Sequence, residues 1–389
     1  MKPVIEGQID GGYDQVADAF AAAFEGRPTM GAALAIRVGG ERVVHLWGGT
    51  ADETDGKQWT KDTASVIFSC TKGLMSILLA RLVQEGRLDY DALVTRYWPE
   101  FGAAGKDKVT VRQLISHKAG LSAPQQDWTL VDMLDWNAAT RLLAEQAPLW
   151  PPGSGYAYHA LTHGWLTGEL VRRIAQKSPG DYFAELVTGP LGASAWIGLP
   201  QDHEGSIAHL QVAPDLAALW QAEAARHTGE RPNWGYRAMT LGEALPPSLV
   251  TKTGGFNDPR IRQAEIPGAG GIATADALAT IWSATVCETQ GAKLLQSAIV
   301  QQATQTETSG PPVFDPQPPY SRWGMGFQLD SDSRRYLTAA SFGHDGAGGQ
   351  VGFADPSHGV GFAFITNWME AAEDFRATRI IDALRAALQ

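Results

Sequence analysis

The chain contains a single S-x-x-K sequence, Ser69 to Lys72. In a helix, residues three positions apart lie on the same face, so the hydroxyl and the amine would be neighbours. A serine needs a base to act as a nucleophile at neutral pH, and a lysine supplies one if apolar surroundings lower its pKa. Residues 66–68, just before Ser69, are all apolar. The spacing therefore predicts a nucleophilic Ser69 with Lys72 as base. The alternative left open is a capping serine beside a solvent-reaching lysine.

A second candidate is Tyr158, which follows a Pro152-Gly153 turn and precedes a helix expected from about Leu161. A phenol between a serine hydroxyl and a leaving group can relay a proton as general acid or base. The alternative is that Tyr158 only packs against neighbouring aromatic residues.

A third candidate is the glycine-rich stretch 343–349, expected on a late strand. So many glycines in a strand indicate close approach of a ligand or another backbone. If this edge lines a cleft, the backbone N–H groups of Ser69 and Ala347 can bind the oxyanion that develops during acyl transfer. The alternative is a hairpin without chemistry.

Several periodic segments must position these groups. Residues 31–49 are expected to form two strands around a Gly-Gly turn. An apolar helix is expected from Ser69 to Gly86. Proline-rich residues 311–319 indicate a linker. Further helices are expected at 111–116, 138–145, 161–175, 215–226, 274–286 and 371–388, and further strands at 323–329, 341–355 and 359–367.

This order of elements predicts an α+β fold. An antiparallel sheet flanked by helices would be built from both chain ends, with a mainly helical domain inserted between them. We expect the sheet-containing α/β domain in residues 1–73 and 310–389, the helical domain in residues 74–309, and the active site in the cleft between the two domains.

Composition excludes several partners and cofactors. A formal net charge of -11 disfavours binding to nucleic acid or to an anionic membrane surface. No apolar run reaches the ~20 residues that span a bilayer, and Met1 to Tyr13 do not resemble a signal peptide, so a cytoplasmic location is expected. Cys70 and Cys287 are expected to be free thiols. We expect no metal and no cofactor, because metal-binding and phosphate-binding motifs are missing and the glycine-rich Gly268 to Ala273 follows no strand.

Taken in order, these motifs resemble those of the serine β-lactamase and penicillin-binding-protein superfamily. The chain is most similar to class C β-lactamases and the related family VIII carboxylesterases. The stretches that carry the resemblance are 67–73, 109–121, 158–160 with 164–166, 267–274, 323–327 and 343–353. The resemblance implies the β-lactamase/transpeptidase-like fold and an acyl-enzyme on Ser69, with Lys72 as base and Tyr158 as proton relay.

Two departures from the family pattern bear on the substrate. Tyr158-His159-Ala160 replaces Tyr-x-Asn, and His344-Asp345-Gly346 replaces Lys-Thr-Gly. A largely neutral imidazole holds a substrate carboxylate less firmly than a permanent cation does.

We therefore expect a carboxylesterase that hydrolyses short-chain, uncharged acyl esters, with small-molecule substrates as its partners. His344, Asp345, Gly346 and Trp128 are candidate substrate contacts. Trp136 and Trp234 could line the same acyl pocket as Trp128, with ordinary packing as the alternative for each. Alternatives to the esterase are β-lactamase or D-amino-acid peptidase activity, acyl transfer through the same acyl-enzyme, and a non-catalytic scaffold. The sequence leaves the oligomeric state open.

Overall fold

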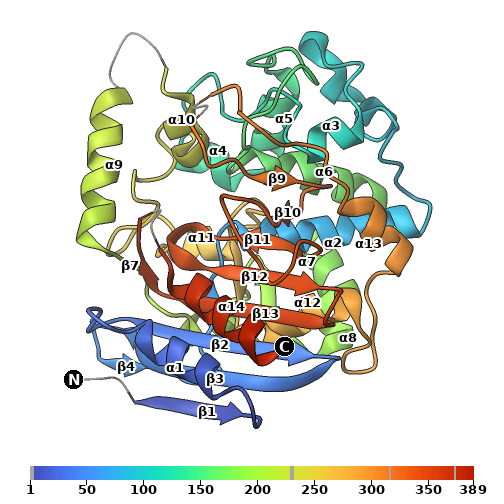
Figure 1. The fold of residues 1–389 in the computed structure, drawn as a ribbon. Coiled ribbons are helices and arrows are strands. Elements are labelled where there is room, and N and C mark those ends of the chain that lie inside the picture. The colour runs from blue at the N-terminus through green and yellow to red at the C-terminus, as the bar shows by residue number, and fades with distance from the viewer. Residues whose placement is uncertain (1–3, 228–231, 315–316, 372–373) are drawn as a thin grey trace.

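The computed structural model describes residues 4–227, 232–314, 317–371 and 374–389, and its main element is a nine-stranded antiparallel sheet. The strand order is β1-β3-β2-β13-β12-β11-β10-β9, with β4 paired to β3. The bounds are β1 (Ile5–Ile9), β2 (Gly31–Val38), β3 (Glu41–Asp52), β4 (Lys57–Gln58), β9 (Arg322–Trp323), β10 (Gln328–Leu329), β11 (Phe342–Asp345), β12 (Val351–Asp355) and β13 (Val360–Thr366). The two chain ends meet where β2 pairs with β13, which Figure 1 shows as adjacent blue and red strands.

Helices cover both faces of this sheet, so β13 is buried along its whole length. On one face, Phe362 and Phe364 pack in a cluster with α1 (Asp14–Ala22) and α14 (Arg376–Ala387). On the other face, small residues admit α12 (Ala275–Val286), and a Cβ on Gly361 would lie 2.3 Å from a backbone oxygen of this helix. Because successive strand residues point to opposite faces, one strand serves both cores.

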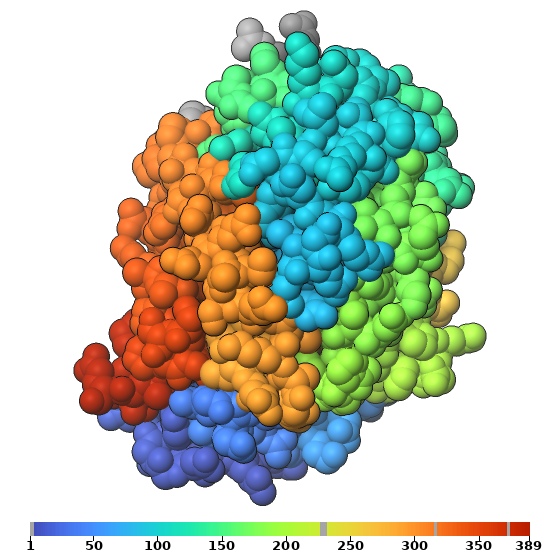
Figure 2. Space-filling model, turned by 90° about the vertical axis from the view of Figure 1, so that its right-hand side faces the viewer, coloured from blue at the N-terminus to red at the C-terminus, as the bar shows by residue number. Residues whose placement is uncertain are grey.

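The remaining elements lie mostly between the two halves of the sheet sequence. They are α2 (Cys70–Gln84), α3 (Val111–Ile115), α4 (Leu130–Leu134), α5 (Trp136–Glu145), α6 (Thr162–Ala175), α7 (Pro179–Phe183), α8 (Gly189–Leu191), α9 (Pro214–His227), α10 (Trp234–Thr240), α11 (Pro259–Gln263) and α13 (Ser297–Ala303). Two small sheets join β5 (Ser65–Val66), β8 (Gly271–Ala273) and β6 (Ala195–Ile197), and β7 (Gln211–Val212) with β14 (Trp368–Met369). Figure 2 shows segments distant in sequence forming one continuous surface.

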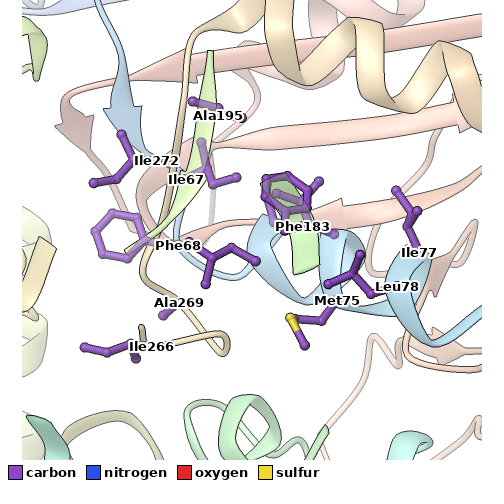
Figure 3. Close-up of a cluster of buried hydrophobic side chains, with 14 of the residues drawn as sticks. Ile67, Phe68, Met75, Ile77, Leu78, Phe183, Ala195, Ile266, Ala269 and Ile272 are labelled. Atoms are coloured by element: carbon purple, nitrogen blue, oxygen red, sulfur yellow. The ribbon is translucent and has the colours of Figure 1, made fainter. Parts of the chain in front are cut away.

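Helix α2 is the central helix, and nearly all of its residues are buried. Its side chains Met75 and Leu78 belong to a large apolar cluster that also contains Phe68, Phe183 and Ile272 (Figure 3). A helix that is apolar around most of its circumference can only be stable when surrounded by protein. The buried helix expected from Ser69 to Gly86 is therefore confirmed.

The predicted α+β fold class is confirmed by this arrangement of helices and antiparallel strands. The domain bounds stay a prediction. Helix α12, which lies inside the expected insert, packs on the sheet against β13. Both cysteines are free thiols, as expected. Within the described ranges, no helix combines the length and apolar character needed to cross a membrane.

Candidate active site

Ser69 lies immediately before the first residue of α2, at the end of a short connection from β5. The preceding residue, Phe68, has a φ of 44°, a conformation that costs energy for a bulky side chain. The Thr71 hydroxyl donates to the Phe68 carbonyl over 2.5 Å, and the Phe68 ring packs edge-on against Phe256. These contacts hold the turn that presents the Ser69 hydroxyl and backbone N–H at the start of the helix.

Lys72 is fully buried and its amine has three polar neighbours. Nζ lies 3.0 Å from Ser69 Oγ and donates to the carbonyl oxygens of Ala160 (2.6 Å) and Gly268 (2.7 Å). Burial lowers the pKa of Lys72 well below its ordinary value. A neutral amine has two N–H bonds and one lone pair. The two carbonyls can accept the two protons, which leaves the lone pair directed at the Ser69 hydroxyl.

Tyr158 lies beside this pair, with the Lys72 amine 4.8 Å from its ring centroid. Burial raises the pKa of the Tyr158 hydroxyl above its ordinary value, and a hydrogen bond with Ser69 opposes that rise. The ring stacks on Trp323 at 5.2 Å, and the His117 ring lies 5.1 Å away. The three candidate catalytic groups are thus brought together around one hydroxyl.

Buried histidines fix the Tyr158 segment through hydrogen bonds. The Leu121 N–H donates to His159 Nε2 (3.1 Å), so His159 Nδ1 carries the proton that is donated to the Ala157 carbonyl. The backbone N–H of His159 donates to His117 Nδ1 (3.2 Å). Burial lowers the pKa of His159 to about 4, so the imidazole stays neutral near pH 7. His159 therefore connects the Tyr158 segment to the segment that holds His117 and Leu121 through hydrogen bonds.

Ala347, the expected second oxyanion donor, lies in the short turn at residues 347–349 that follows β11. A Cβ on Gly346 would lie 2.3 Å from the Ile67 carbonyl oxygen, so only glycine lets Ala347 come this close to the segment before Ser69. Gly348 and Gly349 both have positive φ. The first N–H groups of a helix lack partners within the helix, so the Ser69 N–H suits an oxyanion donor.

The substrate-contact candidates differ in their surroundings. His344 is buried, its Nδ1 lies 2.6 Å from the Asp345 carbonyl oxygen, and no partner for its Nε2 occurs among the described residues. Burial lowers the pKa of His344 well below its ordinary value, so the imidazole is neutral. The Asp345 carboxylate pairs with Arg334 and accepts from the Tyr336 hydroxyl (3.2 Å). Asp345 is therefore held by the protein itself.

A cavity of about 1150 Å³ opens over these groups. It is lined by Ser69, Tyr158, His344, Asp345, Gly346 and Ala347, which were all singled out from the sequence.

Trp128, expected in the same pocket, is not brought there: its buried ring packs edge-on against Trp165 at 5.5 Å. Trp136 does not line the cavity either, because its indole N–H donates to Glu169. Trp234 does line it.

Sequence reasoning missed the histidines at 117 and 163 and the arginine at 376. The His163 Nε2 lies 3.0 Å from the Ile115 carbonyl oxygen, and its ring contacts His117. Arg376 donates to the Gly348 carbonyl (2.9 Å) and so anchors the turn that carries Ala347. These roles depend on contacts between distant segments, and no local pattern signals them.

The comparisons with known proteins fit this geometry. The family model described as beta-lactamase matches residues 16–387. The chain belongs to the beta-lactamase family. Among curated relatives, the esterase/beta-lactamase LipL of Mycobacterium tuberculosis is 34% identical over 367 residues, which cover 93% of this chain and 82% of LipL. The predicted superfamily is therefore confirmed.

Two solved structures align with nearly the whole chain. A family VIII carboxylesterase is 32% identical with a TM-score of 0.88, covering 99% of this chain and 100% of the other. A penicillin-binding protein homologue from Caulobacter crescentus is 35% identical with a TM-score of 0.86, again covering 99% and 100%. The family VIII likeness expected from the motifs is thus present in the fold as a whole.

Proposed function

We propose that this beta-lactamase-family protein is a serine carboxylesterase that hydrolyses uncharged acyl esters through an acyl-enzyme on Ser69. The observation that carries the proposal is the environment of the Lys72 amine. It is fully buried, 3.0 Å from Ser69 Oγ, and hydrogen-bonded to two carbonyl oxygens. An amine in such surroundings is a base that can accept the serine proton.

Acylation follows from these positions. Ser69 Oγ attacks the ester carbonyl carbon while its proton passes to Lys72 Nζ, and the backbone N–H groups of Ser69 and Ala347 bind the oxyanion. The carbon–oxygen bond to the alcohol then breaks. The leaving alkoxide takes the proton of the Tyr158 hydroxyl, which regains a proton from Lys72. Water then attacks the acyl carbon and gives its proton to Tyr158, which passes its own proton to Lys72. The bond between the acyl carbon and Ser69 Oγ breaks, and Oγ regains its proton from Lys72 as the acid leaves.

The charge of the cleft supports a neutral substrate. Along the described lining of the cavity there is no Lys or Arg. His344 is kept neutral by burial, which lowers its pKa, and the Asp345 carboxylate is paired with Arg334. A substrate carboxylate would meet no cation here and would lose its hydration without compensation. Neutral esters avoid this cost.

The direct experiment is mass spectrometry after treatment with a fluorophosphonate. We expect one adduct on the peptide that carries Ser69, and Ser69→Ala should lose both the adduct and the hydrolysis of p-nitrophenyl acetate. Ser154→Ala is the control and should keep both the adduct and the hydrolysis, because the exposed Ser154 hydroxyl donates to the Pro151 carbonyl. Ester hydrolysis that persists in Ser69→Ala would refute the proposal.

A second candidate function is β-lactam hydrolysis, because the relative LipL carries both names, esterase and beta-lactamase. Such substrates carry a carboxylate, so the cleft without a lining cation should process them poorly. A nitrocefin assay beside the ester assay measures this preference. Turnover of nitrocefin at or above that of p-nitrophenyl acetate would favour the second function.

A further inference from the structure

The cleft above Ser69 is far larger than a short-chain ester requires. Its volume of about 1150 Å³ exceeds the ~300–1,000 Å³ that is usual for pockets that enclose drug-sized ligands. An acetate or butyrate ester would leave most of it filled with water. The lining beyond the catalytic groups therefore leaves room for a larger substrate, and its composition indicates the chemical class.

One wall of the cleft is aromatic and begins directly beside Tyr158. A small apolar cluster joins Ala160 with Ala238 of α10, and Tyr158, Trp234 and Met239 pack against it. The Trp234 ring continues this wall to Phe314, whose centroid lies 6.2 Å away.

Phe314 is held from behind by Trp150, in an edge-on contact at 5.6 Å. The Val313 N–H donates to the Tyr156 carbonyl over 2.7 Å, which fixes the segment that carries Phe314. Trp234 and Phe314 are both half-buried and line the cavity. Each ring is thus supported by protein and still reachable from the cleft.

The polar groups on this wall are largely engaged by the protein. The Tyr156 hydroxyl donates to the Gly310 carbonyl (2.6 Å), and the Asn233 side chain donates to the Glu223 carboxylate (3.1 Å). Aromatic rings prefer offset or edge-on aromatic neighbours. An apolar group that binds to this wall removes apolar surface from water, which lowers its free energy.

We propose that the preferred substrates are esters with a bulky aromatic group, of naphthyl size or larger, seated against Trp234 and Phe314. This rests on the proposed esterase function and goes beyond the short-chain, uncharged acyl esters expected from the sequence. The group can belong to the acyl side or to the alcohol side. Both have the same chemistry, and the two arms of the test separate them.

The test compares p-nitrophenyl acetate with 2-naphthyl acetate and p-nitrophenyl 2-naphthoate. Trp234→Ala and Phe314→Ala should lower kcat/KM for at least one naphthyl ester by about 10- to 100-fold, mainly through KM. The same variants should lower kcat/KM for p-nitrophenyl acetate by a smaller factor, because its single ring covers less of the apolar wall than a naphthyl group does. Trp196→Ala is the matched control, since Trp196 is also half-buried but packs at a tilt against His203 outside the cleft.

A measurement on the unaltered protein keeps the proposal testable if the variants fold poorly. The non-hydrolysable 2-methoxynaphthalene should inhibit p-nitrophenyl acetate hydrolysis at about tenfold lower concentration than anisole. Equal inhibition by both ethers, or equal losses for small and naphthyl esters in the variants, would overturn this inference while leaving the esterase function intact. Absence of any Ser69-dependent ester hydrolysis would instead defeat the esterase function itself.

Discussion

Lys72 and Lys106 are both fully buried, and of these two Lys72 alone faces a hydroxyl. The Lys106 amine donates to the carbonyls of Ala103 (2.8 Å), Ala144 (2.9 Å) and Gln146 (2.5 Å), so it joins the end of α5 to a neighbouring turn. For Lys72 the Ser69 hydroxyl takes the place of one of these carbonyls. The chain thus contains its own comparison between a structural lysine and a candidate catalytic one.

Replacing each lysine with methionine should separate the two roles. Lys72→Met should lower kcat/KM for p-nitrophenyl acetate by ~10² to 10⁴, because the serine loses its base. Lys106→Met should keep kcat/KM near the original value and lower the free energy of unfolding by about 1–3 kcal/mol, because buried carbonyls lose their donor. Ester kinetics and urea unfolding measure the two effects. Equal activity losses in both variants would argue against a specific role of Lys72.

The pH dependence of kcat/KM follows from the same two side chains. Lys72 must be neutral to accept a proton, and burial lowers its pKa. Tyr158 must keep its proton, and burial raises its pKa. Activity should therefore rise with pH through the lowered pKa of Lys72, remain high over a wide range, and show no loss near pH 10 from Tyr158. Initial rates from pH 5 to 10 test this, and a profile still rising at pH 10 would contradict a lowered lysine pKa.

At the scale of elements, the site depends on the close approach of β11 to the start of α2. A Cβ on Gly346 would lie 2.3 Å from the Ile67 carbonyl oxygen, and Arg376 holds the following turn through the Gly348 carbonyl. Donors fixed in advance stabilise a developing oxyanion without rearranging during the reaction. The distance between these two elements should therefore affect kcat more than KM.

Gly346→Ala tests this approach. The added Cβ would lie 2.3 Å from the Ile67 carbonyl oxygen and push β11 away, so kcat should fall at least about tenfold with a smaller change in KM. Gly11→Ala is the control, because nothing lies within 4 Å of a Cβ at that position. An unchanged kcat in a folded Gly346→Ala protein would contradict the predicted role of this contact.

Local spacing made part of the site predictable from the sequence. Ser69 and Lys72 lie one helical turn apart, and Tyr158 follows a recognisable turn, so short patterns sufficed to predict that these side chains meet. Their catalytic roles stay a prediction. Trp128 was misplaced because the choice between packing on Trp165 and facing the cleft depends on tertiary contacts. Residues 311–319 indicated only a linker, whereas Phe314 lines the cleft.

The predictability of the fold followed the same division. The long apolar helix at 69–86 and the strands at 31–49 have strong periodicity, and both are present. The first strand, Ile5–Ile9, was missed because it is an edge strand with an exposed middle. In place of the strand expected over 323–329 there are two strands of two residues each, β9 and β10. The last helix begins at Arg376, after the expected start at 371.

At the scale of the whole molecule, four buried histidines lie together where the helical segments meet the sheet. His117 contacts His159 and His163, and the Trp323 ring contacts both His117 and His344. Burial lowers the pKa of His159 to about 4 and of His163 to about 3, and lowers those of His117 and His344 well below the ordinary value. Protonation of these histidines at acid pH therefore affects the free energy of unfolding.

The free energy of unfolding should therefore decrease as the pH falls from about 6.5 to about 4. In that window the unfolded chain binds protons on these histidines and the folded chain does not, which favours unfolding. Each such histidine contributes a slope of up to about 1.4 kcal/mol per pH unit. Urea unfolding at several pH values measures the slope, and His163→Gln should reduce it. A stability that stays constant from pH 6.5 to 4.5 would contradict the buried, neutral state of the cluster.

The central claim is that the Lys72 amine is neutral near physiological pH, and NMR of lysine labelled with ¹³C at Cε tests it directly. The Lys72 signal is assigned by its absence from the spectrum of Lys72→Met. We expect this signal to titrate well below the ordinary lysine pKa of about 10.4, at a pH that matches the rise in kcat/KM. A Lys72 signal that titrates near 10.4, together with full esterase activity at pH 7, would contradict the account.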